Sequence, residues 1–300
     1  MDTGIQNNKY MENPPDEWLD CINHEFRAQS VDVRRRPFLA LGRYCQDFKV
    51  QSLMFGSPPA KRIFDWFCEN TKPESHHIDS LFAGVFYYDT CFWAVDIPIG
   101  YGRFHLEAPD CLRGMSPQLK KDMMLATKDA WSYALFWADC IDYAFGLEDL
   151  TKDSTLNSFG AALLQNGDKE LRAAVSQLLE HRPNSKAAMS SRLAVELFLK
   201  AFLALKAGLT ESCAKDSFGH NLKLLIDECR RVAPQHDLLK IEQHLSDFPN
   251  INERYTGGDQ SKQTLWAAYS IAQYAAASVV RSLTDRDTRF QLQSKLNVAG

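Results

Sequence analysis

Apolar residues in the second half of the chain recur every three or four positions, the spacing that places them on one face of a helix. The segments between these runs carry the residues that start or end helices: Gly208 follows the longest run, and Asn221 precedes the next one. The pattern therefore predicts a succession of helices with short connections. They cover residues 168–180, 185–207, 222–232 and 262–283.

A different pattern occupies residues 82–106. Aromatic and β-branched residues are frequent there, and glycine and proline interrupt them, a composition typical of strands. We expect two or three strands in a small antiparallel sheet. Helical spacing is found before this segment, in residues 16–29 and 60–70, and after it, in residues 117–147.

These patterns predict a mainly α protein, α+β overall, with two domains. The polar stretch LEDLTKDSTLNSFG suggests a boundary near residue 152. We expect residues 1–152 to form an α+β domain of helices and a small antiparallel sheet, preceded by a loose polar tail over residues 1–15. We expect residues 153–300 to form an up-and-down helical bundle.

Composition narrows the classes of function. Hydrophobic residues make up 45% of the 300 residues and charged residues 24%, as in a folded globular protein. The net charge of −4 excludes a global positive field for nucleic acid but leaves room for a local basic patch. The eight cysteines show no CxxC pair and no zinc-ligand spacing, so we predict neither a metal nor a cofactor. The polar N-terminus and the lack of a long apolar run predict a cytoplasmic protein with reduced thiols and no membrane partner.

Polar residues in and after the longest predicted helix form a candidate site. Glu196 and Lys200 are four residues apart and share one helix face, either as a surface ion pair or as part of a polar cluster in the bundle. His220 stands between Gly219 and the helix-starting Asn221. It can cap the loop through a neighbouring carboxylate or carbonyl, or contact a nucleotide or a partner.

The order of these motifs resembles a known family. The helix containing AVELFLKAFLALKAG, then GHNLKLL, then ERY and a long alanine-rich final helix are similar to the HEPN domain, the "higher eukaryotes and prokaryotes nucleotide-binding" domain. The resemblance covers roughly residues 165–285, and the first 150 residues do not share it. The matching residues are Ala194, Glu196, Leu199, Lys200, Ala201, Gly219, His220, Leu222, Arg254 and Tyr255.

The resemblance implies a bundle of four or five helices that often forms a homodimer. Its members are associated with RNA cleavage, nucleotide binding, toxin–antitoxin pairs and phage defence. On this basis we expect a module that binds RNA, a nucleotide or a protein partner in a prokaryotic defence or toxin–antitoxin-like setting. We expect Glu196, Lys200, His220, Arg254 and Tyr255 to converge at one end of the bundle, where they hold either the fold or a ligand.

An alternative function follows from the same resemblance. Active ribonucleases of the family carry Arg-x4-6-His, and Arg231 and His236 have that spacing, with Pro234 between them. Histidine suits proton transfer near neutral pH, and arginine stabilises charge that develops on a phosphate. The pair predicts a metal-independent endoribonuclease. The other interpretation is a basic helix C-terminus, which suits the helix dipole, followed by a turn.

Aromatic residues in the strand segment allow a third interpretation. Tyr87, Tyr88, Trp93 and Tyr101 lie close together in the sequence. They can form a base-stacking surface or the packed core of the sheet.

Overall fold

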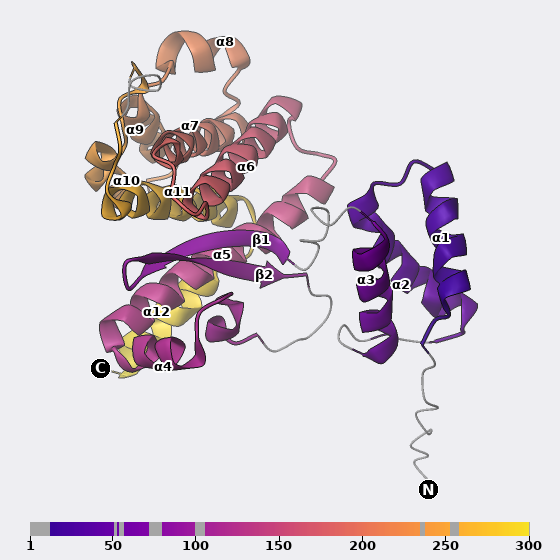
Figure 1. The fold of residues 1–300 in the computed structure, drawn as a ribbon. Coiled ribbons are helices and arrows are strands. Elements are labelled where there is room, and N and C mark those ends of the chain that lie inside the picture. Colours follow the sequence, from indigo (N-terminus) through magenta and orange to yellow (C-terminus); the bar gives the residue numbers. More distant parts are fainter. Residues whose placement is uncertain are drawn as a thin grey trace, which may run out of the picture. The chain divides into compact units, whose positions relative to one another are not determined.

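The computed structural model describes residues 13–50, 53, 57–71, 80–99, 106–234, 238–252 and 258–299. It confirms a mainly helical protein with one small antiparallel sheet (Figure 1). The chain forms two compact units, Met1–Asp79 and Ser80–Gly300.

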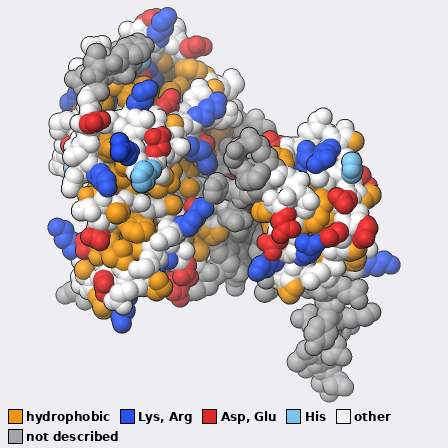
Figure 2. Space-filling model, viewed as in Figure 1, with side chains coloured by type: hydrophobic (Ala, Val, Ile, Leu, Met, Phe, Trp, Pro, Cys, Tyr) orange, Lys and Arg blue, Asp and Glu red, His pale blue; other side chains and the backbone are white. Residues whose placement is uncertain are grey.

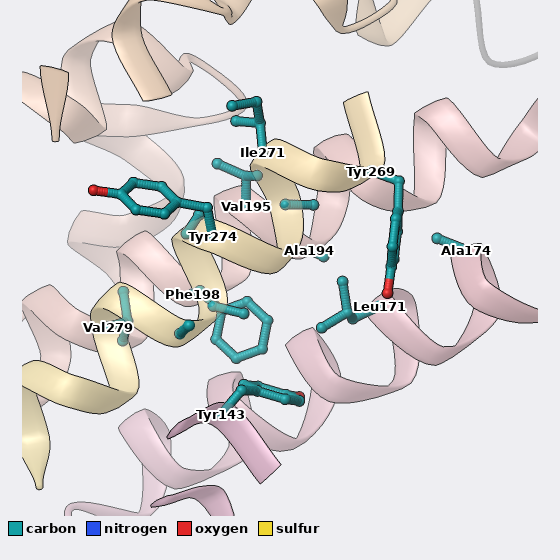
Figure 3. Close-up of a cluster of buried hydrophobic side chains, with 14 of the residues drawn as sticks. Tyr143, Leu171, Ala174, Ala194, Val195, Phe198, Tyr269, Ile271, Tyr274 and Val279 are labelled. Atoms are coloured by element: carbon teal, nitrogen blue, oxygen red, sulfur yellow. The ribbon is translucent and has the colours of Figure 1, made fainter. Parts of the chain in front are cut away.

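The division between the units falls before the sheet rather than near residue 152. The helix α5, Thr127–Lys152, belongs to the same core as the helices that follow it. Its Tyr143 meets Phe198 edge to face, with ring centroids 5.7 Å apart (Figure 3). Since a domain is defined by a shared core rather than by a polar connection, the short stretch after α5 is only a loop.

The described part of the first unit holds three α-helices, α1 (Asp16–Ala28), α2 (Arg36–Asp47) and α3 (Pro58–Asn70). The predictions of α1 and α3 are confirmed, whereas α2 was not predicted. The predicted N-terminal tail lies largely outside the described residues. The three helices enclose a core of Leu19, Ile22, Phe26, Ala40, Tyr44, Ile63, Trp66 and Phe67.

In the residues that the structure describes, the sheet is a hairpin of two antiparallel strands, β1 (Ser80–Tyr88) and β2 (Cys91–Pro98). Its two turn residues, Asp89 and Thr90, both have positive φ (46° and 60°). Two-residue hairpin turns with positive φ at both positions match the right-handed twist of the strands. The hairpin packs on α5 (Figure 1).

Two predicted helices have different bounds in the structure. The segment 117–147 is divided into α4 (Pro117–Leu125) and α5 because Ala126 leaves the helical conformation (φ −81°, ψ 98°). The helix expected to begin at residue 168 is α6, Ser158–Leu178. It begins earlier because the side chain of Asn157 caps it, accepting a hydrogen bond from the Phe159 amide at 2.9 Å.

The helices after α6 are α7 (Lys186–Ala207), α8 (Glu211–Cys213), α9 (Leu222–Val232), α10 (Leu239–Gln243), α11 (Lys262–Leu283) and α12 (Thr288–Ala299). The helix α7 packs against α6, α9 and α11 and is buried on several faces. The predicted ends are confirmed: Gly208 terminates α7 with φ 70°, and the Asn221 side chain caps α9. A closing helix, α12, was not predicted.

The surface carries mixed charge. Figure 2 shows acidic and basic side chains interspersed over the visible face of the second unit, as the small net charge leads one to expect. Within the ranges that the structure describes, no helix is both long and apolar enough to span a bilayer.

Candidate functional site

Three charged side chains on α7 form the base of the candidate site. Arg192, Glu196 and Lys200 are each four residues apart, so they share one helix face. All three are buried, with exposed fractions of 9%, 4% and 8%. Buried charges are found where they are paired, and here each cation has the same carboxylate as its partner.

Glu196 is the centre of this ion cluster. Its Oε1 accepts a hydrogen bond from Lys200 Nζ at 2.8 Å, and its Oε2 lies 3.5 Å from Arg192 Nη1. His220 Nδ1 lies 3.1 Å from both carboxylate oxygens. One carboxylate therefore holds two cations and a histidine. We call Arg192, Glu196, Lys200 and His220 the Glu196 cluster.

The loop that carries His220 is bonded to α7 by the same cations. Lys200 Nζ donates to the Gly219 carbonyl at 2.7 Å, and Arg192 Nη2 donates to the His220 carbonyl at 2.8 Å. A π-helical turn, Ala214–Phe218, leads into this loop. Gly219 has φ 51° and ψ −119°, a conformation that a side chain would disfavour, so glycine is needed where the chain turns toward α7.

The Glu196 cluster carries one excess positive charge when the imidazole is neutral. Arg192 and Lys200 share the Glu196 carboxylate, and their other acceptors are uncharged carbonyls. Burial lowers the pKa of Arg192, and Glu196 opposes that effect. Arg192 Nη1 makes no hydrogen bond despite being buried, which leaves a donor near Glu196 unused.

His220 differs from the rest of the cluster in its exposure. Its side chain is 56% exposed, whereas that of Glu196 is 5% exposed. A carboxylate at Nδ1 favours the tautomer with its proton on that atom, which leaves Nε2 directed away from Glu196. Nε2 can then accept a proton or, when the ring is protonated, donate a hydrogen bond to an anion.

The structure brings together three of the five residues expected to converge. Glu196, Lys200 and His220 are in direct contact, whereas Arg254 and Tyr255 lie outside the described residues. Arg192 was missed by the sequence analysis. Its position one turn before Glu196 was the available signal, because residues four apart meet on a helix surface.

The predicted catalytic pair is described only in part. Arg231 lies in the last turn of α9 with a side chain 71% exposed, and its Nε donates to Glu228 Oε2 at 2.8 Å. The neighbouring Arg230 is paired with Glu242. His236 lies outside the described residues. The guanidinium of Arg231 is thus already engaged with a carboxylate on its own helix.

The aromatic side chains of the hairpin act mainly in packing. Tyr88 and Trp93 are partly buried against the main core, and Trp93 Nε1 donates to the Tyr88 carbonyl at 3.0 Å. Tyr87 packs on Phe92 with ring centroids 5.3 Å apart. Tyr101 lies outside the described residues. These contacts favour the packed-sheet interpretation over a base-stacking surface.

Comparison with known proteins gives no relative from which to carry over a role. No protein-family model, curated protein or solved structure matches the chain. In the part of the chain that the structure covers, no three His, Cys, Asp or Glu side chains gather as metal ligands would. The eight cysteines all lie in the described residues, and none of them forms a disulfide.

Proposed function

We propose that the second unit is a HEPN-like module that binds a phosphate-bearing ligand, a nucleotide or RNA, over the Glu196 cluster. One observation carries the proposal: a buried cluster with an excess positive charge lies directly beneath the exposed ring of His220. A buried charge that is not fully balanced attracts a counter-ion, and phosphate is the anion that nucleotides present.

The start of α9 adds to the attraction for an anion. Its capping residue, Asn221, follows His220 directly, and α9 continues for 11 residues. The amide groups in the first turn of a helix and the positive end of its dipole favour a negative group. His220, the first turn of α9 and the cations of α7 thus combine at one place.

The proposed module binds without cleaving. The ribonuclease alternative needs Arg231 and His236 side by side, but Arg231 contacts Glu228 on its own helix, and His236 lies outside the described residues. His220 has a carboxylate partner, and no exposed arginine in the described structure contacts its ring. The prokaryotic defence setting and the homodimer are part of the proposal through the HEPN resemblance.

Binding of a labelled single-stranded RNA and of ATP, followed by fluorescence anisotropy and calorimetry in metal-free buffer, tests the proposal. We compare the wild type with His220→Ala, His220→Asn and Arg231→Ala. Asparagine can keep a donor near the position of Nδ1 while removing Nε2. We expect the dissociation constant of both His220 variants to rise roughly tenfold or more, because losing a hydrogen bond to a charged group costs about 1.5 kcal/mol. Arg231→Ala should bind like the wild type.

The same samples, run on a gel, distinguish binding from cleavage. Intact RNA beside saturable binding supports the proposed module. Cleavage that is lost in Arg231→Ala and kept in His220→Asn would contradict it and favour the ribonuclease. An absence of binding to both RNA and ATP would contradict the proposed ligand class.

A further inference from the structure

A second polar site lies elsewhere in the same unit, where α5, α10, α11 and α12 meet around a pocket. Its volume is about 170 Å³. A cavity of roughly 150 Å³ accommodates one benzene ring, so this pocket has room for a small one-ring molecule. It is lined by Ser132, Leu135, Phe136, Asp139, Lys240, Trp266, Ser270 and Arg289.

Arg289 offers this pocket a pair of hydrogen-bond donors. Its side chain is 13% exposed, and its Nη1 donates to Asp139 Oδ2 at 2.6 Å and to the Leu135 carbonyl at 3.2 Å. Its Nε and Nη2 donate to none of the described residues. These two nitrogens form the planar fork that binds both oxygens of one carboxylate.

The fork is held in place before any ligand arrives. Asp139 also accepts a hydrogen bond from Arg281 at 2.9 Å, and the ring of Tyr274 lies 5.0 Å from the Arg289 guanidinium. The Asp142 carboxylate accepts the backbone amides of Thr288 and Arg289 at 2.8 and 3.2 Å, which fixes the first turn of α12. A donor positioned in this way loses little entropy on binding.

The rest of the lining combines two aromatic rings with hydroxyl groups and a second cation. Trp266 and Phe136 lie with ring centroids 5.3 Å apart and planes 56° apart, and they supply the apolar part of the lining. Ser132 and Ser270 supply hydroxyls, and Lys240 adds a second cation to the lining. Ligand sites share this combination of apolar surface and a few placed polar groups.

We infer that this pocket binds a small one-ring carboxylate, with its carboxylate on the fork of Arg289 and its ring against Trp266. The Asp139 carboxylate in the wall favours a singly charged ligand over a phosphate dianion, because each further negative charge is repelled. The inference is independent of the Glu196 cluster and of the HEPN resemblance.

Calorimetric titration of the full chain with benzoate tests the inference, with benzyl alcohol as the neutral counterpart and inorganic phosphate as the ringless anion. We expect saturable binding of one benzoate per chain and none of the other two. Arg289→Lys keeps the charge but loses the fork, and should weaken binding roughly tenfold or more. Arg286→Ala is the matched control, since this nearby arginine pairs with Asp149 and is absent from the lining.

A second variant distinguishes loss of the binding site from loss of the fold. Ser132 is exposed and lies outside the ion pairs, so Ser132→Phe fills the pocket without disturbing Asp139 or Arg289. It should abolish benzoate binding while its circular dichroism stays that of the wild type. The inference is overturned if the wild type shows no saturable benzoate binding, if benzyl alcohol binds equally well, or if a folded Ser132→Phe still binds benzoate.

Discussion

Two buried ion clusters of the second unit differ in how the chain assembles them. Arg192, Glu196 and Lys200 come from successive turns of one helix. In the other cluster, Asp139 and Asp142 of α5 meet Arg281 of α11, and Arg281 is separated from Asp139 by 142 positions in the sequence. The first can be recognised from local spacing, whereas the second exists only once three helices have packed.

The clusters also differ in charge balance and access to water. Arg281 and Arg289 face two aspartates, and the side chain of Arg281 is only 9% exposed. The Glu196 cluster has two cations for one carboxylate and an exposed histidine above it. Arg281, almost fully buried between two aspartates, is suited to holding helices together, whereas Arg289 of the same cluster reaches the pocket. The unbalanced Glu196 cluster, with an exposed histidine above it, is suited to attracting an anion.

Among the variants, removing Arg281, the cation that Asp139 and Asp142 share, should lower the unfolding free energy most. Arg281→Met leaves Asp139 and Asp142 with less compensation, and Asp142 is fully buried. Breaking a buried ion pair typically costs about 3–5 kcal/mol, so we expect a loss of unfolding free energy of that order, measured by urea denaturation. Arg286→Ala, which removes an exposed pair with Asp149, is the control and should cost under about 1 kcal/mol. A similar small loss in both variants would contradict the assigned role of Arg281.

Thiol reactivity should reveal the same difference in access. Cys140, next to Asp139, is buried, and burial raises its thiol pKa well above the ordinary value. Cys213, close to the loop of His220, is exposed. A raised pKa means less thiolate at any given pH, so we expect Cys213 to be alkylated at least about a hundredfold faster at pH 8. Peptide mass spectrometry after timed iodoacetamide treatment measures both rates, and comparable rates would contradict the closed packing around Cys140.

Neutralising Glu196 should have a smaller effect than removing Arg281. Glu196→Gln leaves Arg192 and Lys200 buried without their carboxylate, but both keep a hydrogen bond to the loop carbonyls. We expect a loss of about 1–3 kcal/mol in unfolding free energy. Lys223→Gln, which alters exposed ion pairs with Asp227 of α9 and Glu242 of α10, serves as the control and should lower the unfolding free energy by under about 1 kcal/mol. A loss of unfolding free energy for Glu196→Gln as large as that for Arg281→Met would contradict this ranking and mean that the two clusters stabilise the fold equally.

Removing Arg231 should change the stability of the fold least. Its side chain is largely exposed and its partner Glu228 lies on the same helix, so the pair adds little in water. We expect Arg231→Ala to leave the melting temperature within the error of calorimetry. A clear drop would show that Arg231 has a structural contact beyond this pair.

The sequence allowed the helices with clear end signals to be predicted, because those signals act locally. Gly208 and Asn221 end and start helices through their own conformation and side chain. The sequence also allowed three residues to be assigned to one candidate site. Glu196 and Lys200 share a helix face, and His220 follows them in a distinctive motif. Arg192 was missed although it has the same spacing.

Two other features, the pocket around Arg289 and the domain boundary, depend on packing between segments that are distant in the sequence. The pocket around Arg289 uses residues of four helices, and no local pattern brings Asp139 close to α12. The domain boundary was misplaced for the same reason: the polar stretch after α5 reads as a linker, yet the helices on both sides share one core. Short-range spacing could not show either feature.

Histidine side-chain NMR most directly tests the central claim that His220 presents Nε2 to a phosphate-bearing ligand. The chain has eight histidines, and the spectrum of His220→Asn identifies the signal of His220. On addition of a short RNA to the wild type, we predict that the His220 ring signals shift progressively with binding. If the RNA binds while the His220 ring signals stay unchanged, the proposed site is contradicted.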